Sequence, residues 1–326
     1  MNSVLKPEKQ RVFIFDLDNT LGIKKPFHTE IAKGNIELIK GLSEHGNLLC
    51  LATDRPKSLA LAGMYLAGLN EENINSLFAV RIYEDGLLIE SNRGVIYDAL
   101  SQVNSVYKDL KKIAFGDKAI EFFLKKGFLM YPNSAISNNN GKLMEISYDN
   151  KEISEIKMEK NLLPVYRQDN IVRETYKFPD YFFPNLEELA RNVLLLSKFI
   201  SEFFDSEINN WRDVAVLKLW KDSVDVYPIV DSDGISRKAA AMSLVSRHFN
   251  ITNEAEIYFC CDGENDISLV RFIGENFSNH LIVCPSNVND ELKNFLKLRD
   301  LRYVILNEDY HNLHVGLRRV IKNNNL

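Results

Sequence analysis

Short apolar runs alternate along the chain with longer segments whose apolar residues recur at helical spacing. The runs at residues 12–15, 48–52 and 257–261 are rich in β-favouring side chains and end in polar residues, a pattern typical of strands buried on both faces. Strands that alternate with helices in this way predict an α/β fold with a doubly wound, Rossmann-like parallel sheet. The other elements expected in this sheet are helices at 31–42, 57–69, 237–249, 267–273, 289–298 and 311–321 and strands at 78–83, 281–284 and 303–306.

The pattern changes after residue 84, where alternation of strands and helices gives way to a mixed α+β segment. A polar stretch at 133–141 predicts a loop, with its tip at the asparagine run 138–140. A long amphipathic helix is expected at 185–204. The remaining elements expected here are a strand at 143–148 and a hairpin of strands 214–220 and 224–227.

This mixed segment is long enough to form a domain of its own. It ends in residues 228–236, which are rich in Pro, Gly, Asp and Ser and suit a hinge. We therefore predict a core domain made of residues 1–84 and 229–326, interrupted by an inserted α+β domain at residues 85–228.

Composition narrows the range of functions. Of 326 residues, 45% are hydrophobic and 26% charged, as in a globular enzyme, and the formal net charge of -5 argues against a nucleic-acid binder. No apolar run is long enough to span a bilayer, and the first ten residues lack the apolar region of a signal peptide, so a cytoplasmic protein without membrane contact is expected. The cysteines lie in apolar runs without metal-ligand spacing, which favours buried thiols. Oligomeric state is not indicated.

The first apolar run ends in two carboxylates, Asp16 and Asp18, within the sequence DLDNT. Side chains at i and i+2 of an extended segment point to the same side, so both carboxylates can reach one substrate atom. In an open α/β sheet, ligands bind at the carboxyl ends of the strands. An Asx-turn closing a strand accounts for the pair equally well when the pair is considered alone.

Three further segments follow in order: ATDR at residues 52–55, Lys238 near the start of a helix, and DGEND at residues 262–266. With DLDNT, they resemble the four ordered motifs of the haloacid dehalogenase superfamily of phosphotransferases. The insertion point resembles that of the larger α/β cap, the C2 type, in Cof-like and sucrose-phosphate phosphatases.

The resemblance implies a Mg²⁺-dependent phosphatase acting on a small phosphorylated metabolite, a sugar phosphate for this cap type. Asp16 would be the nucleophile and Asp18 the general acid and base. Thr53 and Lys238 would bind the phosphoryl group. The metal would be held by Asp16, the main-chain carbonyl of Asp18 and Asp262, with Asn265 and Asp266 orienting that shell.

Two positions depart from the family pattern, since Asp54 and Cys261 stand where glycines are usual. A side chain is costly there if the backbone must adopt positive φ. Lys221 and Arg237 are alternative candidates for the lysine position. A phosphomutase of the phosphomannomutase type and a non-catalytic sensor with the same fold remain alternatives to the phosphatase.

Overall fold

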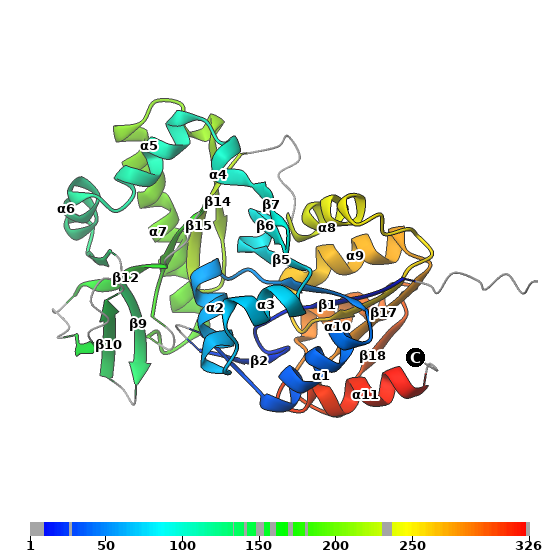
Figure 1. Ribbon diagram of the computed structural model, residues 1–326. Helices are drawn as coiled ribbons and strands as arrows, with labels where there is room; N and C mark the ends of the chain where they lie inside the picture. The colour runs from blue at the N-terminus through cyan, green and yellow to red at the C-terminus, as the bar shows by residue number, and fades with distance from the viewer. Residues whose placement is uncertain are drawn as a thin grey trace, which may run out of the picture. The chain divides into compact units, whose positions relative to one another are not determined.

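The computed structural model describes residues 10–25, 28–132, 134–139, 142–147, 153–156, 161–168, 172–179, 182–229 and 237–323. The chain forms two compact units, shown in Figure 1. We call Met1–Tyr97 with Ile235–Leu326 the core unit, and Asp98–Gly234 the inserted unit.

An eight-stranded sheet forms the centre of the core unit, in the order β18-β17-β16-β1-β4-β5-β6-β7. The strands from β18 to β5 in this order are parallel, and β6 pairs antiparallel with β5. Their bounds are β1 Arg11–Phe15, β4 Leu48–Ala52, β5 Val80–Tyr83, β6 Leu88–Ser91, β7 Gly94–Asp98, β16 Glu256–Cys260, β17 Asn279–Cys284 and β18 Tyr303–Ile305.

Helices cover both faces of this sheet. Alternate residues of β1 enter different cores: Phe13 and Phe15 pack in the core with α1, α2, α3 and α11, and Val12 and Ile14 in the core with α8, α9 and α10. In Figure 1, α1 and α11 accordingly lie on the opposite side of the sheet from α8 and α9. The bounds are α1 Lys33–Glu44, α2 Lys57–Leu66, α3 Glu71–Leu77, α8 Arg237–His248, α9 Ile267–Asn276, α10 Asp290–Lys297 and α11 Leu313–Asn323.

These elements agree with the sequence-based expectations apart from a few boundaries. The expected helix at 31–42 is wrong at its start, because Ile31 belongs to a strand, β3 (Thr29–Ile31), and α1 begins at Lys33. The helix expected at 57–69 ends at Leu66, because Gly68 turns the chain at φ +84. The expectation of buried thiols is confirmed for the four cysteines, Cys50, Cys260, Cys261 and Cys284.

A small hairpin of β2 (Gly22–Lys24) and β3 follows the first strand of the sheet. Two glycines allow its close packing. A Cβ on Gly22 would lie 2.2 Å from the Glu30 oxygen, and a Cβ on Gly63 of α2 would lie 2.4 Å from the Thr29 oxygen. Only glycine therefore permits α2 to approach the Thr29 backbone this closely.

The core unit extends beyond the domain boundary expected after residue 84. The strands β6 and β7 continue its sheet, so that the units divide after Tyr97. Between β5 and β6, the 3₁₀ turn η1 (Glu84–Gly86) is left-handed, with φ +48 at Glu84 and +59 at Asp85.

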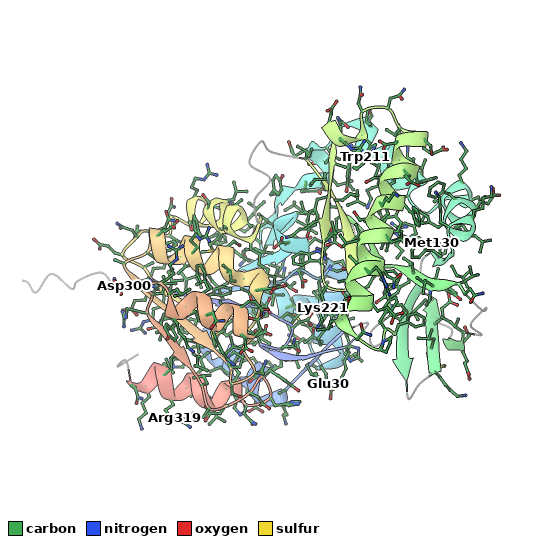
Figure 2. All side chains as sticks on the ribbon, turned by 180° about the vertical axis from the view of Figure 1, so that it is seen from behind. Glu30, Met130, Trp211, Lys221, Asp300 and Arg319 are labelled. Atoms are coloured by element: carbon green, nitrogen blue, oxygen red, sulfur yellow. The ribbon has the colours of Figure 1, made fainter. Side chains whose placement is uncertain are left out.

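The inserted unit contains a five-stranded mixed sheet in the order β14-β15-β13-β12-β8 and a three-stranded antiparallel sheet in the order β11-β10-β9. Its core is rich in aromatic residues and includes Met130 and Trp211, both labelled in Figure 2. The bounds are α4 Ala99–Gln102, α5 Ser105–Ile113, α6 Asp117–Lys125, β8 Phe128–Tyr131, β9 Ser134–Asn139, β10 Lys142–Ser147, β11 Ile153–Glu155, β12 Leu163–Gln168, β13 Glu174–Lys177, α7 Leu186–Glu207, η2 Trp211–Asp213, β14 Ala215–Leu219 and β15 Ser223–Pro228.

One expectation in this unit is wrong. The polar stretch at 133–141 was predicted as a loop, but residues Ser134–Asn139 form β9, because each pairs with a residue of β10. The expected hinge at 228–236 lies outside the described residues from position 230 onward. The predicted α/β class, with a parallel core sheet and a separate inserted mixed sheet, is confirmed. No helix in the described ranges has the length and apolar character needed to cross a membrane.

Candidate active site

Three neighbouring parallel strands end at one edge of the core sheet. Asp16 follows β1, Thr53 follows β4, and Asp262 comes two residues after β16. Main-chain hydrogen bonds continue the sheet past β1 and β4, since the Asp16 amide donates to the Cys260 carbonyl and the Thr53 amide to the Ile82 carbonyl, both at 2.9 Å. The strand ends therefore bring these side chains together, as expected for the ligand site of such a sheet.

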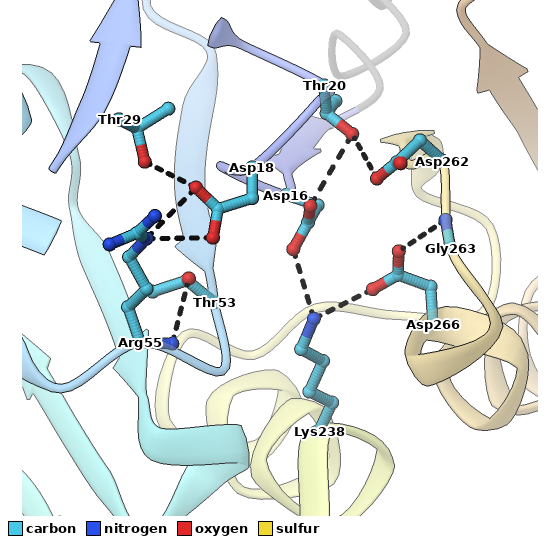
Figure 3. Close-up of polar contacts among 10 residues, drawn as sticks. All are labelled: Asp16, Asp18, Thr20, Thr29, Thr53, Arg55, Lys238, Asp262, Gly263 and Asp266. Carbon is cyan, nitrogen blue, oxygen red and sulfur yellow. Dashed lines mark hydrogen bonds and ion pairs between the residues drawn. The ribbon is translucent and has the colours of Figure 1, made fainter. Parts of the chain in front are cut away.

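Lys238, the second residue of α8, reaches the first of these carboxylates. Its Nζ lies 3.1 Å from Asp16 Oδ1 and 2.7 Å from Asp266 Oδ1, as Figure 3 shows. Burial alone lowers the pKa of Lys238, but the carboxylates of Asp16 and Asp266 outweigh it and raise that pKa well above the usual value. This lysine is therefore a fixed positive charge beside Asp16.

Of the three basic candidates, Lys238 contacts Asp16 within the core unit. Lys221 is exposed at the turn between β14 and β15 of the inserted unit, labelled in Figure 2. The side chain of Arg237 lies outside the described part of the chain.

Asp262 and Asp266 give this edge more negative than positive charge. Asp16, Asp262 and Asp266 each offer a carboxylate oxygen within 4.8 Å of the others, a geometry that suits a metal ion. Burial, and then Asp266, raises the pKa of Asp262 to about 7. Burial also raises the pKa of Asp16 well above its usual range, against the opposing effect of Lys238. A bound cation would relieve this excess of negative charge.

Thr20 joins the two sides of this cluster, and sequence reasoning did not assign it a role. Its hydroxyl lies 3.4 Å from Asp16 Oδ2 and 3.2 Å from Asp262 Oδ1 (Figure 3). Asn19 has φ +56, a conformation that asparagine tolerates, and its amide donates to Gly22 in a tight turn. Thr20 could have been identified from the sequence because it is the last residue of the DLDNT motif.

Asp18 interacts with a different partner from Asp16. Its two carboxylate oxygens lie 2.9 and 2.7 Å from Arg55 Nε, and the Thr29 hydroxyl donates to Oδ1 at 2.5 Å. All three side chains are buried. Sequence reasoning missed Arg55 and Thr29; Arg55 ends the ATDR segment, whereas no local pattern singles out Thr29.

Two further predicted residues lie at the edge of the site. Thr53 is fully buried, and its hydroxyl accepts a hydrogen bond from the Arg55 amide at 3.1 Å. Asn265 lies against Gly263, where a Cβ would meet its Oδ1 at 2.4 Å. Among the described residues, Asn265 forms no hydrogen bond with the aspartates, whereas Asp266 Oδ2 accepts one from the Gly263 amide at 3.4 Å.

The two departures from the usual glycines cause no backbone strain. Neither Asp54 nor Cys261 has positive φ. Cys261 is fully buried and packs in the core with α8, α9 and α10. Both side chains are therefore compatible with the local backbone.

Comparison with known proteins agrees with this geometry. A family model described as haloacid dehalogenase-like hydrolase matches residues 13–295. No curated protein sequence matches the chain.

Solved structures with similar folds cover nearly the whole chain. A haloacid dehalogenase-like hydrolase from Bacteroides thetaiotaomicron has a TM-score of 0.55 at 16% identity, over 97% of this chain and 99% of its own. Another structure from that organism, described among the phosphatases of the haloalkanoate superfamily, has a TM-score of 0.51 at 16% identity, over 99% of this chain and 98% of its own. A Thermoplasma acidophilum protein has a TM-score of 0.50 at 13% identity, over 97% and 98%.

These structural likenesses concern the fold, a core with an inserted cap. The family model extends from the first strand of the core sheet to α10 and therefore includes every aspartate of the candidate site. The chain belongs to the haloacid dehalogenase-like hydrolase family.

Proposed function

We propose that the protein is a Mg²⁺-dependent phosphatase that hydrolyses a small phosphate monoester, of the sugar phosphate class, through an aspartyl-phosphate on Asp16. The observation that carries this proposal is the contact of Asp16 with Lys238, beside the carboxylates of Asp262 and Asp266. A carboxylate nucleophile next to a fixed cation and a set of metal-binding oxygens suits phosphoryl transfer, in which catalysis is mostly positioning and electrostatics.

Asp16, Asp262 and the main-chain carbonyl of Asp18 would hold the Mg²⁺ ion, with Asp266 and Asn265 orienting them. The carboxylates fit such an ion because they are hard oxygen donors close together and because negative charge is in excess among them. When bound, Mg²⁺ would reduce the repulsion between the attacking carboxylate and the phosphate dianion.

The reaction then divides into two steps. An oxygen of Asp16 attacks phosphorus while the bond to the leaving oxygen breaks, and Asp18 gives its proton to that oxygen. In the second step, Asp18 takes a proton from a water molecule that attacks the phosphorus of the aspartyl-phosphate. Inorganic phosphate leaves and Asp16 is regenerated. Lys238 neutralises negative charge on the phosphoryl group, and Thr53 binds one of its oxygens.

Phosphate release from a panel of sugar phosphates, with Mg²⁺ and with EDTA, tests this proposal. We expect Mg²⁺-dependent turnover that is lost in Asp16→Asn. Glu256→Gln is the matched control. Glu256 is the first residue of β16 in the same sheet, and its carboxylate pairs with Arg11. Hydroxylamine trapping should detect an aspartyl-phosphate in the wild type and in Glu256→Gln, but not in Asp16→Asn.

Two outcomes would contradict the proposal. Conversion of one hexose phosphate into another without phosphate release would favour the phosphomutase. Absence of both reactions, with or without Mg²⁺, would favour a non-catalytic protein.

A further inference from the structure

The general acid and base of the proposed reaction has a dedicated set of contacts. Arg55 Nε lies within hydrogen-bond distance of both oxygens of Asp18, and Thr29 donates to one of them. The relative exposures of Asp18, Arg55 and Thr29 are 8%, 3% and 0%, so water competes little for these bonds. A carboxyl group held by two buried donors has little freedom to rotate.

Arg55 is itself fixed by three separate segments. Besides Asp18, its Nη2 donates to the Lys25 carbonyl at 2.7 Å, next to the β2–β3 hairpin. Its amide donates to the hydroxyl of Thr53, which follows β4. Arg55 therefore joins the loop after β1, the hairpin and the turn after β4.

Thr29 is fixed through its backbone. It is the first residue of β3, where it pairs with Lys24 of β2. On its other side lies Gly63 of α2, which comes so close that a Cβ would lie 2.4 Å from the Thr29 oxygen. The position of the Thr29 hydroxyl is therefore determined by the packing of the hairpin against α2.

We propose that Arg55 and Thr29 are positioning residues for Asp18, which fix the direction of its carboxyl group for both proton transfers. The first transfer gives the Asp18 proton to the leaving oxygen as its bond to phosphorus breaks. The second moves a proton from the attacking water to Asp18. The inference rests on the proposed phosphatase function, and it assigns to these two residues no contact with the phosphoryl group.

A comparison of leaving groups tests this role, because only a poor leaving group needs a proton. With a sugar phosphate, we expect Arg55→Lys and Thr29→Val to lower kcat by about 10²-fold, the usual contribution of general acid catalysis, with little change in KM. With 4-nitrophenyl phosphate, the first turnover should remain close to the wild-type rate. A burst of nitrophenolate should follow from this, since hydrolysis of the aspartyl-phosphate still needs Asp18.

Two variants control for general effects on folding. Thr29→Ser retains the hydroxyl and should recover most of the activity lost in Thr29→Val. Arg81→Lys changes an equally buried arginine of the same unit, which lies 3.8 Å from Glu90. It should show neither the burst nor a difference between the two substrates. Thermal unfolding of each variant would identify any that does not fold.

The outcomes separate this inference from the proposed function. Equal losses for both substrates without a burst, or a rise in KM alone, would overturn the positioning role and indicate that Arg55 binds substrate. Loss of activity in Thr29→Ser equal to that in Thr29→Val would also overturn it. A wild-type protein without phosphatase activity would instead contradict the proposed function.

Discussion

Both units of the protein contain a cluster of buried charged side chains. The cluster around Glu174 in the inserted unit and the cluster around Asp16 in the core unit differ in the ratio of cations to carboxylates. In the inserted unit, the buried Glu174 has two cations, since its carboxylate lies 2.5 Å from Lys111 Nζ and 2.9 Å from Arg167 Nε. In the core unit, one cation, Lys238, contacts both Asp16 and Asp266, and Asp262 lies beside them.

The difference shows why burial of charge alone does not identify a functional site. Buried ion pairs also occur in the architecture of proteins, where each charge has its partner. At the edge of the core sheet, carboxylates exceed cations, and the pKa values of Asp16 and Asp262 are raised as a result of burial and mutual repulsion. The excess charge, and not burial itself, makes this site suited to a cation.

The largest contrast between the two groups is expected in activity. Asp262→Asn should reduce Mg²⁺-dependent turnover by about 10³-fold, because it removes a carboxylate from the proposed metal site. Glu174→Gln, which keeps the side-chain shape, should change turnover by less than about 3-fold, since a buried structural charge acts on stability instead. Steady-state kinetics over a range of Mg²⁺ concentrations would measure both, and similar losses in both variants would contradict the distinction.

A smaller contrast is expected in stability. Lys238→Met leaves Asp16 and Asp266 facing each other without a cation, and should cost about 3–5 kcal/mol of the free energy of unfolding in EDTA. Lys111→Met should cost less, because Arg167 still pairs with Glu174. Urea denaturation of the two variants would measure the difference. Equal losses in the free energy of unfolding would show that the charges around Asp16 are as well balanced as those around Glu174.

The pH dependence of stability sharpens the same comparison. The pKa of Asp262 is about 7 in the folded, metal-free protein, above its ordinary value of 3.8, so folding favours the protonated form. Its contribution to stability is therefore complete below about pH 4 and is lost as pH rises through about 7. In EDTA, the Tm of the wild type should fall relative to that of Asp262→Asn between about pH 5 and pH 8. Mg²⁺ should reverse this fall; a constant difference between the two proteins would contradict it.

The smallest effects on stability are expected at Asp54 and Cys261, the two positions where the family pattern has glycine. Neither Asp54 nor Cys261 has positive φ, so glycine relieves no strain there. Cys261→Gly should cost about 1 kcal/mol, since it removes buried packing and increases the freedom of the unfolded chain. Urea denaturation would measure it, and a gain in stability would show that the cysteine is strained.

The parallel strands of the core sheet could be predicted from the sequence because they are nearly continuous apolar runs, whereas β6 and β7 were assigned to the inserted domain. The same feature located Asp16, Thr53 and Asp262, since residues after parallel strands lie at one edge. In the inserted unit, the polar strand β9 was predicted as a loop because its pairing with β10, and not its own composition, makes it a strand.

The partners within the site could not be predicted in the same way. The Asp18 to Arg55 contact joins positions 37 apart, and the Asp16 to Lys238 contact joins positions 222 apart. Lys238 was predicted only from the resemblance to the family. Arg55 was given no role, although it is the last residue of the ATDR segment. Thr29 depends on the close approach of Gly63, which only the folded chain brings about.

The left-handed turn at Glu84–Gly86 also has a practical consequence for engineering this protein. Glu84 and Asp85 adopt positive φ in succession, at a cost of about 1–2 kcal/mol for each residue with a Cβ. The turn nevertheless supports the candidate site, because the amides of these residues donate to the carbonyls of Arg55 and Thr53 at 3.0 and 3.2 Å. Any substitution at this turn must therefore keep both amides in place, and glycine and asparagine are the residues whose backbone best tolerates the positive φ that this requires.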